Sequence, residues 1–262
     1  MHPMSKKRSR TVEQSRKVSP FWVFMAVAAV LLGGGLIYQN MRVSSAVPAT
    51  AEPLPVPVLA PTGPNLPPLA APAGAKAVFF GDSWTVGYAA DPQSHGYAYL
   101  TGDQLGWDYT VKGDSGTGYI NRGPNNTGNY IDRLRAFPVD PSVQVLVLQG
   151  GLNDSGAPLA DFYNIGRQTV IDARGRFPNA KIVMLGPAAA SLPVSAGLSQ
   201  VDYQLRSVAF DEGIYYVSPL SDHWIGTDNF EQVIDLSKKN HPSTQGHAFL
   251  AEKTVAAIRA LG

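Results

Sequence analysis

A serine stands directly after a short apolar run, in the sequence Gly81-Asp82-Ser83. Residues 77–80 read Ala-Val-Phe-Phe, which is typical of a buried strand. Open α/β folds place their chemistry at the carboxyl ends of such strands. A serine there can act as a nucleophile when a base lies within reach. Because Gly, Asp and Ser also favour plain turns, the interpretation depends on partners elsewhere in the chain.

The strongest candidate for that base is His241, one of five histidines in the chain. Pro242 favours an extended backbone at His241 and places its imidazole on a loop just before the last predicted helix. His247 falls within that helix, where we expect it to pack or to form hydrogen bonds. The Ser83 and His241 side chains together would suit nucleophilic catalysis.

Two further segments offer hydrogen-bond donors for a developing negative charge on oxygen. The first, residues 111–119 (VKGDSGTGY), contains Gly116, whose backbone N–H can approach a ligand closely. The second, residues 148–154 (LQGGLND), contains Asn153, whose neutral side-chain amide is a directional donor. Each segment alone is also compatible with a simple turn. Ser115 lies in a second Gly-Asp-Ser triplet and is a rival nucleophile.

The elements that must position these residues alternate along the chain from Lys76 onward. Continuous apolar, β-prone runs alternate with segments of helical spacing, which is typical of a parallel sheet covered on both faces. The predicted strands are residues 77–80, 109–111, 143–148, 181–185 and 215–217, and the predicted helices are residues 95–105, 130–136, 159–176, 198–212 and 244–261. We therefore predict one α/β domain over residues 76–262.

The order of these motifs resembles the four sequence blocks of the SGNH (GDSL) hydrolases. The blocks are Gly81-Asp82-Ser83, the Gly116 loop, Gly151-Leu152-Asn153-Asp154 and His241-Pro242, and they extend over nearly all of residues 76–262. The resemblance implies a flavodoxin-like, three-layer α/β/α sandwich around a parallel five-stranded sheet. It also implies ester or acyl-group chemistry.

The same resemblance implies a role for each matching residue. Ser83 would be the nucleophile and His241 the general base. The backbone N–H groups of Ser83 and Gly116 would form the oxyanion hole together with the side chain of Asn153. Asp82 and Asp154, which adjoin these residues, are expected to form hydrogen bonds to the loop backbone.

One position departs from the family pattern. The family usually has Asp three residues before the histidine, and this chain has Lys238 there. A lysine cannot orient the imidazole or stabilise its protonated form as a carboxylate would. Three explanations remain open: Asp235 completes a triad from a longer loop, a backbone carbonyl supports a Ser-His dyad, or the site is impaired.

The N-terminal region predicts export and membrane attachment. Residues 21–38 form 18 consecutive uncharged, mostly apolar positions, at the lower limit for a membrane-spanning helix. Six basic residues precede this segment in residues 1–20, so the positive-inside rule predicts a cytoplasmic tail, a transmembrane signal anchor and an extracytoplasmic remainder. A cleaved signal peptide, with Ala49-Thr50-Ala51 as the cleavage site, is the alternative and would make the protein secreted.

The composition of residues 39–75 is typical of a linker. Nine prolines lie between Pro48 and Pro72, which favours an extended, semi-rigid polyproline II segment over a helix or a central strand. The sequence therefore predicts a catalytic domain held away from the membrane.

Composition excludes several other classes of function. The chain has no cysteine, so there is no thiol nucleophile, and no cluster of ligands predicts a metal site. Residues 76–262 carry 14 basic and 18 acidic side chains, without the basic surface that a nucleic-acid-binding protein needs. We expect no cofactor and no nucleic-acid partner.

The most specific expectation is a serine esterase that cleaves short-chain acyl esters, such as O-acetyl groups on cell-envelope glycans or lipids. Two alternatives are an acyltransferase, in which a glycan hydroxyl replaces water, and a non-catalytic anchored binding module with the same fold. The aromatic residues Trp84, Tyr88, Tyr119 and Trp224 are candidates for stacking on sugars, although most of them are expected to pack in the core.

Overall fold

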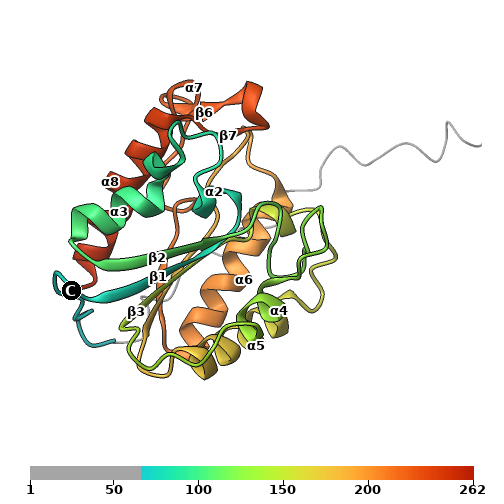
Figure 1. Cartoon of the computed structure of the whole chain (residues 1–262). Helices are drawn as coiled ribbons and strands as arrows, with labels where there is room; N and C mark the ends of the chain where they lie inside the picture. The colour runs from blue at the N-terminus through green and yellow to red at the C-terminus, as the bar shows by residue number, and fades with distance from the viewer. Residues whose placement is uncertain (1–65) are drawn as a thin grey trace, which may run out of the picture. The chain divides into compact units, whose positions relative to one another are not determined.

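Five parallel strands form the central sheet of the structure, a computed structural model that describes residues 66–262 (Figure 1). The strands are β1 (Lys76–Gly81), β2 (Asp108–Gly113), β3 (Val145–Gln149), β4 (Lys181–Leu185) and β5 (Tyr215–Val217). Their order across the sheet is β2-β1-β3-β4-β5. The predicted α/β fold with a parallel five-stranded sheet is confirmed, and β4 and β5 have the predicted bounds.

Each interior strand is apolar on both faces because both faces of the sheet are covered. Successive side chains of a strand point to opposite sides, so Phe79 and Phe80 of β1 belong to two separate cores. Helices α3 (Tyr97–Leu105) and α8 (Thr244–Ala260) pack on the first face. Helices α4 (Tyr130–Arg135), α5 (Phe162–Arg176) and α6 (Ala196–Glu212) pack on the second (Figure 1). The result is the predicted three-layer sandwich.

The strand order reverses at the carboxyl end of β1. The chain passes from β1 outward to β2 and then returns to β3 on the other side of β1. Open α/β sheets bind their ligands where the strand order reverses in this way. Gly81 at the end of β1 permits close packing here, since a Cβ atom would clash with Thr85 and Gln149.

A small C-terminal hairpin was not predicted from the sequence. Helix α7 (Phe230–Val233) leads into strand β6 (Ile234–Asp235), a 3-10 helix (Leu236–Lys238) and strand β7 (His241–Pro242). The two strands are antiparallel, with Asp235 opposite His241. Strands of only two residues are too short to show an alternating pattern, so the sequence predicted a loop in this region.

The packed region begins before Lys76. Leu69 is buried, and its backbone N–H donates a hydrogen bond to the Leu261 carbonyl. The Tyr215 hydroxyl donates to the Pro67 carbonyl at 2.6 Å. Residues 66–75, assigned to the linker by their prolines, therefore contact the catalytic domain.

The expected cytoplasmic tail, membrane span and most of the linker lie outside the described residues. Within residues 66–262, no helix has both the length and the apolar character required to cross a membrane. The transmembrane signal anchor at residues 21–38 stays a prediction from the sequence.

Candidate active site

Ser83 is the first residue of the four-residue helix α2 (Ser83–Val86), directly after β1. The Asp82 carboxylate caps this helix by accepting a hydrogen bond of 2.9 Å from the Trp84 N–H, as predicted for a buried Asp at a turn. Asp82 is fully buried, and this burial raises its pKa to about 7. The first N–H groups of a helix have no partner within it, and no described residue accepts a hydrogen bond from the Ser83 N–H. That N–H is available to a ligand oxygen.

The structure brings His241 to Ser83 across 158 positions of sequence. The Ser83 Oγ and His241 Nε2 atoms lie 2.7 Å apart. His241 is in β7 and not in a plain loop as predicted, but the final helix does begin three residues later at Thr244. The imidazole is half-buried, between the nucleophile candidate and the surface.

The other nitrogen of the His241 ring faces two backbone carbonyls. Its Nδ1 atom lies 2.9 Å from the Lys238 oxygen and 3.0 Å from the Lys239 oxygen. Carbonyl oxygens only accept hydrogen bonds, so Nδ1 carries the proton and Nε2 presents its lone pair to the Ser83 hydroxyl. This tautomer is the one that a general base requires.

A strained turn directs these carbonyls at the ring. Lys239 and Asn240 both have a φ of 57°, in the left-handed region. This conformation costs a lysine on the order of 1 kcal/mol, whereas asparagine adopts it more readily. Two such residues in succession reverse the chain between the 3-10 helix and β7. The turn therefore supplies from the backbone the contact that the family usually obtains from an Asp side chain.

The structure does not bring the Asp235 carboxylate to the imidazole. Asp235 lies opposite His241 in the β6–β7 pair, but its carboxylate accepts hydrogen bonds from the N–H (2.8 Å) and the hydroxyl (2.6 Å) of Ser237. It caps the 3-10 helix whose carbonyls reach His241. The Ser237 hydrogen bonds hold the pKa of this carboxyl below its usual value. The triad contact, one of the three explanations that the sequence left open, is thus absent, because the carboxylate is occupied by its own turn.

Burial keeps the base neutral. Removal from water lowers the pKa of the His241 imidazole, and the positive charge of Lys239 lowers it further. The two carbonyl hydrogen bonds act in the opposite direction but are outweighed. His241 is therefore unprotonated at neutral pH, when it can accept a proton.

The two other predicted oxyanion donors lie on either side of Ser83. Gly116 follows β2 and Asn153 follows β3, the neighbours of β1 in the sheet. Gly116 has a φ of 78°, and no acceptor for its N–H is found within the described part of the chain. One hydrogen of the Asn153 amide is donated to the Thr117 carbonyl at 2.9 Å. The second hydrogen of that amide group is left for a ligand.

Arg133 holds the Gly116 loop in place, a role that sequence reasoning missed. Its guanidinium donates hydrogen bonds to the Gly81 carbonyl (2.9 Å), the Thr117 hydroxyl (2.7 Å) and the Lys112 carbonyl (2.7 Å). It also stacks on the Phe80 ring, 4.3 Å from the ring centroid. Arg133 is three residues after the buried Tyr130, so helical spacing alone would have directed it toward the core.

Asp154 fixes the loop that follows Gly116. Its carboxylate accepts hydrogen bonds from the backbone N–H groups of Tyr119 (2.9 Å), Ile120 (3.0 Å) and Asn121 (3.0 Å). The predicted role of Asp154 is confirmed. Burial raises the pKa of this carboxyl despite the three donors. Asp154 thereby ties the loop after β2 to the loop after β3.

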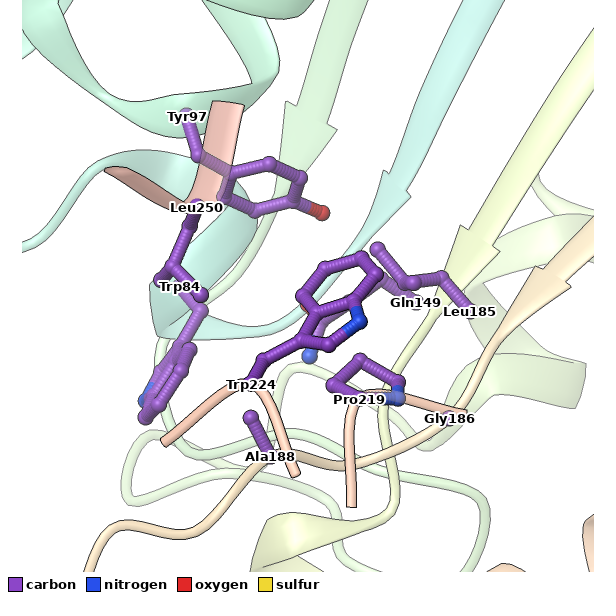
Figure 2. Close-up of a pocket in the computed structure, with 9 residues that line it drawn as sticks. All are labelled: Trp84, Tyr97, Gln149, Leu185, Gly186, Ala188, Pro219, Trp224 and Leu250. Carbon is purple, nitrogen blue, oxygen red and sulfur yellow. The ribbon is translucent and has the colours of Figure 1, made fainter. Parts of the chain in front are cut away.

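Of the four candidate aromatic residues, three are in the core. Trp84, Tyr119 and Trp224 are buried, whereas the Tyr88 side chain is 37% exposed. Trp84 and Trp224 line a small pocket together with Tyr97, Gln149 and Pro219 (Figure 2). Its cavity of about 20 Å³ has room for about one water molecule. Ser83, His241 and Asn153 are not among its lining residues, although Trp84 directly follows Ser83 in the chain.

The remaining predictions concern Ser115, His247 and metals. No described hydrogen bond joins Ser115 to a histidine. His247 is fully buried on α8 and forms hydrogen bonds, as predicted. Among residues 66–262, no group of three or more His, Asp or Glu side chains is arranged to hold a metal ion.

Comparisons with known proteins agree with this geometry. A model of the GDSL-like Lipase/Acylhydrolase family matches residues 79–249. A GDSL lipase of Mycobacterium tuberculosis is 28% identical over 167 residues, and the match spans 60% of this chain and 66% of that protein's length.

Two solved structures illustrate the likeness in fold. A family two carbohydrate esterase from Clostridium thermocellum, in complex with cellohexaose, has a TM-score of 0.54 and 24% identity, covering 72% of this chain and 65% of that one. A member of the lipolytic G-D-S-L family from Veillonella parvula has a TM-score of 0.55 and 18% identity, covering 70% of this chain and 97% of that one.

Proposed function

The chain belongs to the GDSL-like lipase/acylhydrolase family and is a carboxylic ester hydrolase, and we propose that Ser83 and His241 form its catalytic dyad. The observation that carries this assignment is the 2.7 Å contact between Ser83 Oγ and His241 Nε2. The hydrogen bonds from His241 Nδ1 to two carbonyls support it, because they fix the reactive tautomer.

The reaction proceeds through an acyl-enzyme. His241 Nε2 accepts the Ser83 hydroxyl proton as Oγ attacks the acyl carbonyl, giving a tetrahedral intermediate with a negatively charged oxygen. His241 then donates that proton to the leaving alcohol as the C–O bond breaks. Water attacks the acyl-enzyme in the same way and releases the acid and free Ser83.

The negatively charged oxygen is bound by the N–H groups of Ser83 and Gly116 and by the Asn153 amide. Each such donor contributes a few kcal/mol to the transition state, or about 10²–10³ in rate. The carbonyls of Lys238 and Lys239 replace the carboxylate of a triad. Their dipoles orient the imidazole and stabilise its protonated form, though less than a full negative charge would.

The proposed substrates are short-chain acyl esters, with O-acetyl groups on cell-envelope glycans first among them. Support comes from the family membership and from the carbohydrate esterase of similar fold whose structure contains cellohexaose. The apolar segment at residues 21–38 and the basic residues before it support an extracytoplasmic, membrane-tethered location. That proposed location is the reason for choosing acylated glycans or lipids of the cell envelope as the proposed substrates.

The nucleophile is tested with the full-length chain and p-nitrophenyl acetate. Ser83→Ala should lower kcat by about 10³ or more and abolish labelling by a serine-directed fluorophosphonate. Ser115→Ala is the matched control, from the second Gly-Asp-Ser triplet, and should keep both properties. Loss of labelling in Ser115→Ala with retention in Ser83→Ala would reverse the assignment.

A further inference from the structure

Tyr88 is the one candidate aromatic residue that is both exposed and in contact with the proposed dyad. Its ring lies over the His241 imidazole, with the centroids 4.5 Å apart and the planes tilted by 55°. More than a third of its surface is open to solvent. One part of the phenol ring therefore packs on the base while another part faces outward.

The backbone of Tyr88 is fixed on both sides. Its N–H donates a hydrogen bond of 2.9 Å to the carbonyl of Ser83. Its carbonyl accepts one of 3.0 Å from Nε2 of the buried His247. The Tyr97 N–H donates to the other ring nitrogen of His247 at 3.2 Å, so the orientation of this second histidine is set as well. The backbone that carries the Tyr88 ring is thus fixed beside the site, a use for His247 that the catalytic steps do not require.

The proposed mechanism determines which part of a substrate would meet this ring. His241 Nε2 gives its proton to the leaving alcohol, so the alcohol oxygen must lie within hydrogen-bond reach of the imidazole. The group attached to that oxygen then extends past His241. Because Tyr88 covers His241, its exposed part borders the path of the leaving alcohol.

We propose that Tyr88 forms the subsite for the alcohol part of the substrate and that this part is a sugar ring. The inference rests on the proposed function of Ser83 and His241. A rigid phenol presents a flat apolar face and a polar edge, which match the C–H face and the hydroxyl groups of a pyranose. A short linear alcohol would cover much less of this face.

The test compares two acetate esters that differ only in the alcohol, a methyl glycoside carrying one acetyl group and ethyl acetate. Tyr88→Ala should reduce kcat/KM for the sugar ester about tenfold, mainly through KM, the size expected for an aromatic contact. Removing the ring also uncovers His241, so some kcat/KM is lost with ethyl acetate as well, but this loss should be several-fold smaller than the loss with the sugar ester. Tyr88→Phe keeps the apolar face and loses the polar edge, so its loss of kcat/KM for the sugar ester should be smaller than that of Tyr88→Ala.

Tyr203→Ala is the matched control, because Tyr203 is a 56% exposed tyrosine on α6. This variant should leave kcat/KM unchanged for both esters. An equal loss of kcat with both esters in a folded Tyr88→Ala protein would mean that Tyr88 only packs on His241, and the subsite would be rejected. If the wild type cleaves ethyl acetate but not the sugar ester, the alcohol part of the substrate is not a sugar ring. The proposed Ser83–His241 dyad would be unaffected by that result. If the folded wild type cleaves neither ester, the proposed function itself is contradicted.

Discussion

The ring nitrogen Nδ1 of His241 lies 2.9 Å from the backbone oxygen of Lys238, three residues earlier in the chain. This is the position at which related sequences usually carry an aspartate. The side chain here has the opposite charge, yet the backbone of the same residue makes the contact. The substitution at residue 238 is therefore compatible with an oriented base, provided that the turn at Lys239 and Asn240 keeps its left-handed conformation.

Asp235 should matter as a cap and not as a catalytic acid. Asn also caps helices well, so Asp235→Asn should keep kcat for p-nitrophenyl acetate within about threefold of wild type. Replacing a triad carboxylate by an amide typically costs about 10⁴ in kcat. Asp235→Ala loses the cap and should lower kcat several-fold. If Asp235→Asn instead lowers kcat by several orders of magnitude, Asp235 is the acid of a catalytic triad.

The pH dependence of kcat/KM should reflect the lowered pKa of His241. The base works only when unprotonated, so the midpoint of the acid limb should lie below the ordinary histidine pKa of about 6.5. Lys239→Gln removes a nearby positive charge, raises the pKa of His241 and should move this acid limb toward neutral pH. Lys238→Gln is the control and should leave the profile unchanged, because Lys238 affects the ring only through its carbonyl. Identical profiles for all three proteins would contradict the role given to Lys239.

Asn153→Ala should lower kcat about 10²–10³-fold with little change in KM, because the amide acts mainly in the transition state. The variant also loses the hydrogen bond to the Thr117 carbonyl, so thermal unfolding is measured alongside the kinetics. Full kcat in Asn153→Ala would exclude this side chain from the oxyanion hole.

Arg133 is expected to act as a positioning residue. In Arg133→Met the Phe80 contact is partly kept, but the partly buried contacts with the Gly81 carbonyl and the Thr117 hydroxyl are lost, at about 1–3 kcal/mol each. The third lost contact, with the Lys112 carbonyl, is exposed to solvent and should cost less. The Gly116 loop should loosen, with kcat reduced about tenfold and KM nearly unchanged, measured well below the lowered melting temperature. Arg135→Met, which removes only the surface ion pair with Asp172 (3.1 Å), should change neither property. If Arg133→Met loses stability and keeps kcat, Arg133 has only a structural role.

The sequence by itself determined the fold class and named Ser83 and His241, whose side chains the structure brings into contact. Apolar runs and helical spacing are properties of contiguous residues, so β4 and β5 were predicted to the residue and β1 nearly so. Gly-Asp-Ser, Asn153 and His241 were found because each follows a strand or precedes a helix, where the parallel topology collects side chains at one edge.

The tertiary structure alone decided how the base is held and what surrounds it. A backbone carbonyl is present at every residue, so no side-chain identity could mark Lys238 and Lys239 as the partners of His241. The two-residue strands β6 and β7 depend on long-range pairing and leave no local pattern. The support from Arg133 and the exposure of Tyr88 also arise from contacts between segments far apart in the chain. Sequence periodicity encodes which face of an element is buried, and only the folded chain defines which groups meet there.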